Sequence, residues 1–429
     1  MDLFFGPKYG KTLIVIFLAA FIWGIGMLAF RNYFEKGSDT KKSDWNSSEL
    51  YGDAKNFFDR AVSLSEFKPY DEGVVPAVAY YRPPGYPLFL AFVFLFAGYS
   101  LKAVIILQIL IAALIAAIIA DTGRILLDIK IGFFAGILAI FYLPLWNASS
   151  TVNSEILSLL YWALSLNLMI RFVKTDCINN TQILLSGLLA GMSAITRGQF
   201  LMLAPLSLLF IYFSGSKKKM IPALKWMSLF LLPVLAWAAY AYLVSGLFVI
   251  VSTQGLFAVW WGWSPAVVLE ESYPVWNPEW SNISVPADQI GQLVPYKSAG
   301  WFLKEVYSFV TLYPKESFLI GLFKLMESWG LEFYNGQPVL NGIVRFLKIN
   351  WNLILSVPAV ILLYNNKDLK GFLKFLLVLC IAYTFVSVLT AALYRYRFAT
   401  LDIFFLILAS YTVLHYSRKI FRKKADSKT

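Results

Sequence analysis

The distribution of apolar residues along the chain predicts a helical protein that crosses a membrane several times. Long apolar runs recur from the first residues to the last and are separated by short polar or charged stretches. Runs that approach about 20 residues match the hydrocarbon thickness of a bilayer. Ten runs are interpreted as spans, at 12–30, 101–120, 131–146, 155–171, 182–196, 200–214, 226–250, 349–364, 373–392 and 398–416.

The run 86–98 is too short for a span and starts in a proline cluster, which favours an interfacial or re-entrant helix. Leaving it out of the count puts every short basic loop on the side of the N-terminus, as the positive-inside rule requires. Both termini are therefore predicted to be cytoplasmic. The segment 31–100 and the long stretch 251–348 then lie outside.

Composition supports a multi-pass membrane protein and excludes a soluble enzyme. Of the 429 residues, 59% are hydrophobic and only 14% are charged. The net charge of +12 is attributed to basic cytoplasmic loops, and no nucleic-acid partner is expected. Two cysteines and one histidine provide neither a disulfide framework nor a histidine-based metal site.

Three regions are predicted along the chain. Residues 1–250 form a transmembrane module that includes the first outer loop, 31–100. Residues 251–348 form a larger outer loop, and residues 349–429 supply the last spans and a basic tail.

A short amphipathic helix is predicted in the first outer loop, at residues 50–61. Asp53 falls on the edge of its apolar stripe, where the membrane meets outer water, whereas Asp59 faces solvent. Asp53 is either a functional carboxylate or an ordinary solvated helix charge. The stripe consists of Leu50, Ala54, Phe57, Phe58 and Ala61.

Further charged residues share this predicted outer side. Arg82 lies in a rigid diproline loop, where it either binds a phosphate or extends to lipid headgroups. Glu155 opens a span, a position that the helix dipole also favours. Arg197 lies between two short spans, and Arg395 and Arg397 precede the last one. Their common side indicates a site for an anionic substrate at the outer membrane surface.

Two other structural roles stay open for residues in this region. Arg397 could form a purely structural pair with Asp402, about one turn further along. Tryptophans such as Trp260, Trp261, Trp276 and Trp280 are typical of a membrane-interface belt and also of sugar-stacking surfaces.

Seven segments, in order, resemble the GT-C superfamily of membrane glycosyltransferases. The resemblance is to bacterial relatives of dolichyl-phosphate-mannose–protein mannosyltransferases and of lipid A aminoarabinose transferases. The segments are YGDAKNFFDRA, YRPPGYPLFLAF, SEILSLLYWALSL, GLLAGMSAITRGQFLMLAPL, VSTQGLFAVWWGWSP, YPKESFLIGLFKLMESW and YRYRFATLD.

The resemblance implies an inverting transfer of a sugar from a polyprenyl-phosphate carrier to a hydroxyl of a glycan, lipid or protein acceptor. Asp53 is expected to be the general base, with Glu155 orienting the acceptor or pairing with an arginine. Arg82, Arg197, Arg395 and Arg397 are expected to bind the lipid phosphate. Residues expected to line the substrate site are Tyr81, Tyr86, Gln199, Trp260 and Trp261.

No cofactor is expected with a monophosphate-linked donor, although a carboxylate-only site between Asp53 and Glu155 would suit Mg²⁺ or Mn²⁺. The expected location is the bacterial inner membrane, with the active site outside.

Two other classes of protein stay open. A lipid-linked sugar flippase or transporter would place charges near the bilayer midplane, whereas the runs 12–30, 101–120 and 226–250 have no internal charge. A polysaccharide polymerase or ligase would also be multi-span with outer arginines.

Overall fold

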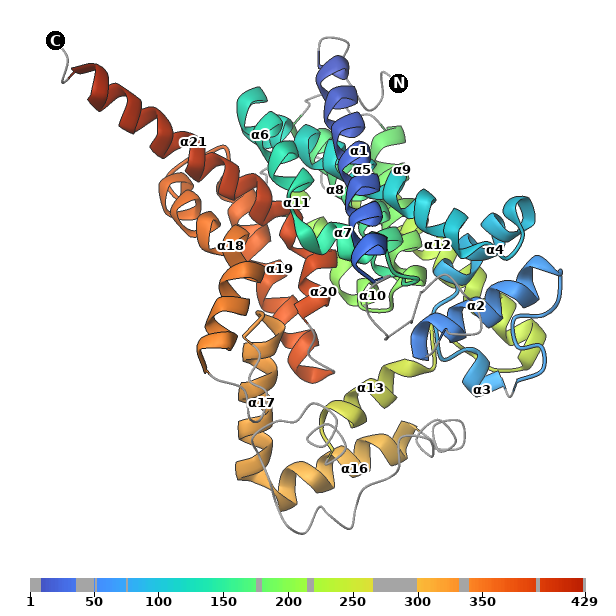
Figure 1. The fold of residues 1–429 in the computed structure, drawn as a ribbon. Helices are drawn as coiled ribbons and strands as arrows, with labels where there is room; N and C mark the ends of the chain where they lie inside the picture. The colour runs from blue at the N-terminus through green and yellow to red at the C-terminus, as the bar shows by residue number, and fades with distance from the viewer. Residues whose placement is uncertain are drawn as a thin grey trace.

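The computed structural model consists of helices joined by loops (Figure 1). The structure describes residues 9–35, 50, 52–74, 76–174, 180–213, 220–264, 299–331, 339–390 and 394–426. No strand occurs in these ranges. The predicted all-α polytopic membrane fold is therefore confirmed.

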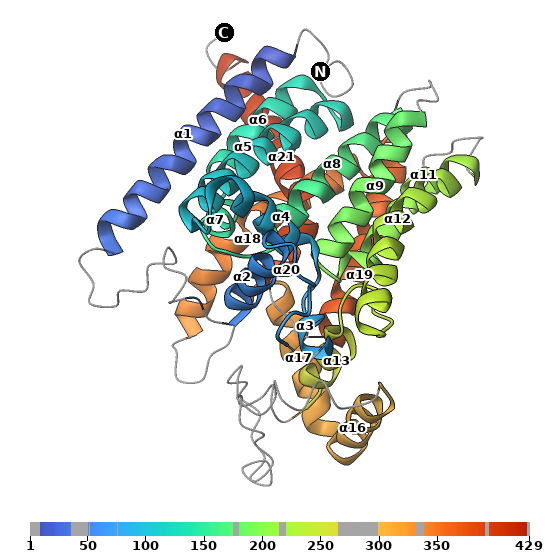
Figure 2. The same cartoon turned by 90° about the vertical axis from the view of Figure 1, so that its right-hand side faces the viewer.

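Long apolar helices form the body of the molecule and run side by side, as Figures 1 and 2 show. Each of the ten predicted spans overlaps one or more helices. The helices of this body are α1 (Gly10–Glu35), α5 (Leu101–Leu126), the shorter α6 (Ile129–Ile140), α8 (Glu155–Lys174), α9 (Asn180–Thr196), α12 (Met220–Ser245), α18 (Val339–Leu363), α19 (Lys370–Leu389) and α21 (Asp402–Asp426).

Six described helices are long and apolar enough to cross a membrane, or up to seven if the bent pair of α6 and α7 (Leu143–Ser149) is one span. The run 200–214 is not one helix. It is divided into α10 (Phe200–Leu203), the 3-10 turn η2 (Ala204–Ser207) and α11 (Leu208–Phe213), with Pro205 at the turn. Proline lacks an N–H donor and interrupts a helix. The figure of ten spans thus stays a prediction.

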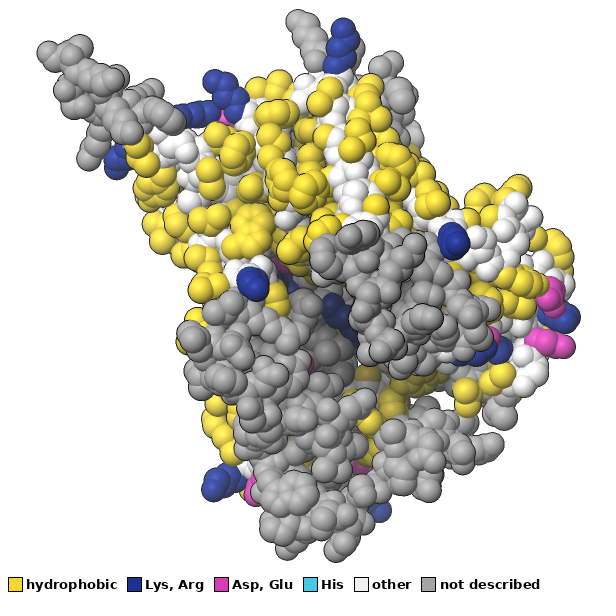
Figure 3. Space-filling view, viewed as in Figure 1, with side chains coloured by type: hydrophobic (Ala, Val, Ile, Leu, Met, Phe, Trp, Pro, Cys, Tyr) yellow, Lys and Arg dark blue, Asp and Glu magenta, His cyan; other side chains and the backbone are white. Residues whose placement is uncertain are grey.

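The two ends of the helical body differ in charge. Helix α1 begins, and α21 ends, at the same end of the bundle (Figures 1 and 2). Lys and Arg side chains gather at this end above a mostly hydrophobic band, as Figure 3 shows. Here Asp121 pairs with Arg124 at 2.7 Å and also with Arg171.

Shorter helices form a layer at the opposite end. They are α2 (Gly52–Ser65), α3 (Pro76–Ala79), α4 (Gly85–Ala97), α13 (Gln254–Gly262), α16 (Ala299–Leu312), α17 (Pro314–Ser328) and α20 (Tyr394–Thr400). The short run 86–98 becomes α4, of 13 residues. Trp276 and Trp280 lie outside the described residues. Helix α18 crosses the predicted boundary at residue 348.

The amphipathic helix predicted at residues 50–61 is α2, and its apolar stripe packs inward. The Phe57 ring lies 5.1 Å from that of Tyr86, and the Phe58 ring 5.3 Å from that of Phe94. Both contacts are edge-to-face, a favourable arrangement for aromatic pairs. Asp59 faces outward, as predicted, and pairs with Lys55 at 2.5 Å.

Two glycines allow α9 and α12 to approach closely. Gly187 and Gly191 are four residues apart and therefore lie on one face of α9. A Cβ atom on Gly187 would overlap the carbonyl oxygen of Trp226, and one on Gly191 would overlap that of Phe230. Small residues at this spacing are typical of packed membrane helices.

Gly191→Ala is expected to destabilise the protein by about 1–3 kcal/mol, because a methyl group must push the α12 backbone away. Gly26→Ala on α1 is the matched control, since a Cβ there meets nothing within 4 Å. Thermal melting in detergent would measure both. Equal melting temperatures for the two variants would contradict the prediction.

A buried lysine forms a hydrogen bond with the last residue of α13. Lys324 on α17 is 0% exposed, and its Nζ donates to the carbonyl oxygen of Gly262 at 2.9 Å. The indole N–H of Trp263 donates to the carbonyl oxygen of Leu389 at 3.1 Å. Burial lowers the pKa of Lys324 to about 7, although nearby Glu327 opposes the shift.

The lowered pKa of Lys324 predicts that the stability of the protein depends on pH. Between pH 7 and the ordinary lysine pKa of 10.5, the unfolded lysine binds a proton that the buried amine lacks, so its contribution to stability rises with pH. The difference in stability between Lys324→Met and wild type should therefore favour the methionine variant most near pH 7 and move towards wild type as the pH rises to 10. Thermal melting across this range, with Lys304→Met as control, checks the slope; parallel curves would refute it.

Candidate functional site

A cavity of about 550 Å³ lies where the layer of short helices meets the long ones. Its charged lining residues are Asp53, Arg82, Arg197 and Arg395. Much of the remaining wall is apolar and comes from α10, α13 and α19. These apolar residues include Met202, Leu203, Leu256, Val259, Val386 and Leu389.

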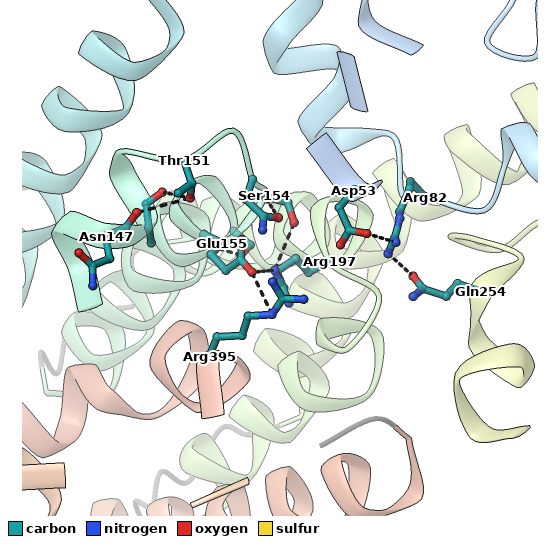
Figure 4. A network of polar contacts seen from close by, with 12 residues as sticks. Asp53, Arg82, Asn147, Thr151, Ser154, Glu155, Arg197, Gln254 and Arg395 are labelled. Atoms are coloured by element: carbon teal, nitrogen blue, oxygen red, sulfur yellow. Dashed lines mark hydrogen bonds and ion pairs between the residues drawn. The ribbon is translucent and has the colours of Figure 1, made fainter. Parts of the chain in front are cut away.

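One polar cluster links α2 and the Arg82 loop to α13. Asp53 lies in the first turn of α2, where the helix dipole favours an acid. Arg82 donates from Nη2 to Asp53 Oδ1 and from Nη1 to Gln254 Oε1, the latter at 3.0 Å. The Asp53 side chain is 34% exposed. Its second oxygen, Oδ2, accepts no hydrogen bond from a described residue. Figure 4 shows this chain of contacts.

A second polar cluster contains one carboxylate and two guanidinium groups. Glu155, at the start of α8, is 5% exposed. Its Oε1 lies 2.8 Å from Arg197 Nη1 and 3.7 Å from Arg395 Nε (Figure 4). Glu155 does not itself line the cavity but lies behind the two arginines, which do. It therefore neutralises and orients them, since a buried charge needs a partner.

Close packing brings the Arg82 loop to the second cluster. A Cβ atom on Gly85 would overlap Thr196, the last residue of α9, directly before Arg197. The backbone N–H of Thr253 donates to the carbonyl oxygen of Tyr80 at 2.9 Å. The buried Tyr70 donates its hydroxyl to the carbonyl oxygen of Arg82 at 3.1 Å. These contacts fix the loop on both sides.

Arg397 does not line the cavity. It is fully buried, and its Nε donates to Asp402 at 2.9 Å while Nη1 donates to Asn350. The Tyr142 hydroxyl binds the same aspartate. This geometry matches the structural Arg–Asp pair, the role that the sequence left open for Arg397.

The aromatic residues expected to line the site lie beside the cavity. Tyr86 is buried and donates to Gln108 at 2.7 Å. Tyr81, Trp260 and Trp261 pack in an aromatic cluster around Phe257, on α13 and its neighbours. These rings brace α13, whereas Gln199 does line the cavity.

Sequence reasoning missed Gln254, Tyr70 and Lys324. Gln254 could have been noticed as a polar residue directly ahead of an aromatic-rich run. Nothing in the sequence distinguishes Tyr70 or Lys324 from exposed residues of the same type. The described residues contain no group of three or more His, Cys, Asp or Glu side chains that could hold a metal ion.

Comparison with known proteins gives one family match and several similar folds. A family model described as dolichyl-phosphate-mannose-protein mannosyltransferase matches residues 81–240, less than half of the chain. This segment contains Arg82, Glu155 and Arg197. No curated protein sequence matches the chain.

The fold resembles that of an oligosaccharyltransferase from Archaeoglobus fulgidus. The apo form matches with a TM-score of 0.59 and 13% identity, and AglB with an inhibitory peptide and a dolichol-phosphate matches with 0.57 and 12%. Each match covers 98% of this chain and 52% of the other, so the chain spans about half the length of the archaeal protein.

A weaker likeness is to ArnT from Cupriavidus metallidurans bound to undecaprenyl phosphate. Its TM-score is 0.40 at 11% identity, with 85% of this chain and 73% of the other covered, which is too low to support an argument. Residues 81–240 are thus similar to the dolichyl-phosphate-mannose-protein mannosyltransferase family, and the fold is similar to that of the archaeal oligosaccharyltransferase.

Proposed function

We propose that the chain is an inverting glycosyltransferase that moves a sugar from a polyprenyl-phosphate carrier to an acceptor hydroxyl at the outer membrane surface. The observation that carries the proposal is a single cavity with a partly exposed carboxylate, three guanidinium groups and an apolar wall. A lipid phosphate needs the cations and the apolar wall, and an acceptor hydroxyl needs the carboxylate.

The phosphate would bind at Arg197 and Arg395. These two cations share one carboxylate, Glu155, so their cluster keeps a net positive charge. Arg82 is engaged by Asp53 and Gln254 and adds a third cation at the cavity edge. The isoprenoid chain would lie against apolar residues of α10 and α19.

Transfer would proceed in one step. The acceptor oxygen attacks the anomeric carbon and gives its proton to Asp53, while the bond from that carbon to the phosphate oxygen breaks. The polyprenyl monophosphate leaves with the bonding electrons, and Arg197 and Arg395 stabilise its developing charge. One direct displacement inverts the anomeric configuration.

The cavity suits this chemistry without a metal ion. Among the described lining residues Asp53 is the carboxylate, and an arginine already holds one of its oxygens. Glu155 is screened from the cavity by two arginines. Guanidinium groups can supply the charge stabilisation that a divalent cation would give to the leaving phosphate.

Charge distribution supports the outer location and favours transfer over transport. The lining charges come from helix ends and loops at the end of the bundle opposite the basic loops, where the positive-inside rule puts the outer surface. A transporter typically carries its charges near the middle of broken helices. The archaeal relative was solved with a dolichol-phosphate, which fits a lipid-phosphate ligand.

Asp53→Asn is expected to lower transfer by about 10²–10⁴-fold, because the amide cannot accept the acceptor proton. Binding of undecaprenyl phosphate should remain within about twofold, since that site uses other residues. Purified protein with a labelled polyprenyl-phosphate sugar and mass spectrometry of the product would measure transfer. Asp59→Asn is the control, and near-normal turnover of Asp53→Asn would remove the base assignment.

Arg395→Ala is expected to weaken binding of undecaprenyl phosphate by about tenfold or more, because a charge-assisted contact is lost. Arg418→Ala, at an exposed arginine on the basic end of α21, is the matched control. Titration of the lipid into nanodisc-embedded protein would compare them. If both variants bind the lipid as wild type does, the phosphate site lies elsewhere.

A further inference from the structure

The buried polar atoms of the lining residues that lack a hydrogen-bond partner are donors, whereas acceptors without a hydrogen bond remain at Asp53 Oδ2 and at Glu155 behind the arginines. Arg82 occupies one oxygen of Asp53 and the side-chain oxygen of Gln254, and Arg197 donates to Ser154 Oγ at 3.3 Å. Three buried N–H groups of lining residues have no hydrogen-bond partner within the described chain. They are Arg82 Nε, Gln199 Nε2 and Arg395 Nε.

The formal charges of the lining residues show an excess of positive over negative groups. The described lining residues carry three guanidinium groups and one carboxylate. Glu155, behind Arg197 and Arg395, reduces the local sum to one positive charge. A phosphodiester carries one negative charge and would balance it. The sugar attached to that phosphate would then meet N–H groups that need acceptors.

We propose that this cavity selects a sugar that is uncharged and hydroxylated, and that Gln199 determines this specificity by binding a sugar hydroxyl. The proposal rests on the glycosyltransferase function above and specifies its donor. A hydroxyl oxygen can accept from an unsatisfied N–H, whereas a protonated amino group offers only donors. Its charge would also be repelled by Arg197 and Arg395.

Gln199 is well placed for this role. It follows Arg197 by two residues, in the turn between α9 and α10, and its backbone carbonyl oxygen accepts from the N–H of Leu203 at 3.1 Å. That bond fixes its backbone next to the arginine cluster. The amide is uncharged in either orientation, so it cannot neutralise an ammonium group.

The test compares matched donors on the full-length protein in nanodiscs. One probe is a neutral hexose linked to undecaprenyl phosphate, and the others replace its C2, C4 or C6 hydroxyl by a primary amine. Bare undecaprenyl phosphate reports the phosphate site alone. Wild type should bind the hydroxylated donor about tenfold or more tightly than each amino donor, as expected when buried donors are left unpaired.

Two variants identify Gln199 as the specificity residue. Gln199→Ala should weaken binding of the hydroxylated donor by about tenfold and leave the affinity for bare undecaprenyl phosphate unchanged. The isosteric Gln199→Glu adds a negative charge and should narrow or reverse the preference for at least one amino donor. Gln182→Glu, the same change near the start of α9, should keep the wild-type preference. If Gln199→Glu fails to fold, the wild-type preference and Gln199→Ala decide.

The outcomes separate this inference from the proposed function. If wild type binds bare undecaprenyl phosphate but binds an amino donor as tightly as the hydroxylated one, the inference is wrong and the proposed function stands. If Gln199→Ala keeps the wild-type affinity for the hydroxylated donor, Gln199 is not the specificity residue. If bare undecaprenyl phosphate does not bind, the proposed function fails, and the inference fails with it.

Discussion

The site depends on one buried carboxylate. Glu155 is 5% exposed and lies between Arg197 and Arg395, which come from segments about 200 residues apart in the chain. Removing water from three charged groups is costly unless they compensate one another. The cluster therefore fixes the start of α8, the end of α9 and α20 in one arrangement. Because one acid serves two bases, this arrangement also leaves a positive charge facing the cavity.

Small residues make the rest of the geometry compatible with this cluster. Gly85 lets the Arg82 loop touch Thr196, and the glycines of α9 let α12 pack against the same helix. Backbone contact at Gly85 thus adds to the side-chain pairs that join the walls of the cavity. Tyr70 then holds the Arg82 carbonyl from the other side. The resulting loop is rigid, as expected for a residue that must present a guanidinium group in a fixed direction.

Much of this could be predicted from the sequence, because periodicity and charge act locally. Apolar runs predicted the long helices, and a helical stripe with an acid on its edge predicted α2 and the position of Asp53. The prediction that Arg82, Glu155 and Arg197 lie on the same side of the membrane placed them in one site. Sequence could not separate Arg395 from Arg397, since only tertiary packing decides which one meets Asp402. From the sequence, Trp260 and Trp261 of α13 were expected to contact the substrate. Their packing against other rings could not be predicted, because residue spacing does not show which rings meet in the fold.

Helix α13 is held in place by one set of residues and lines the cavity with another. Contacts at its two ends and an aromatic cluster on one side hold it in place, whereas Leu256, Ala258 and Val259 face the cavity. Substitutions at the latter positions can alter the shape of the pocket while the supporting contacts stay unchanged. Related chains could therefore diverge in the molecules they accept through a few changes on one helical surface, without evolving a new scaffold.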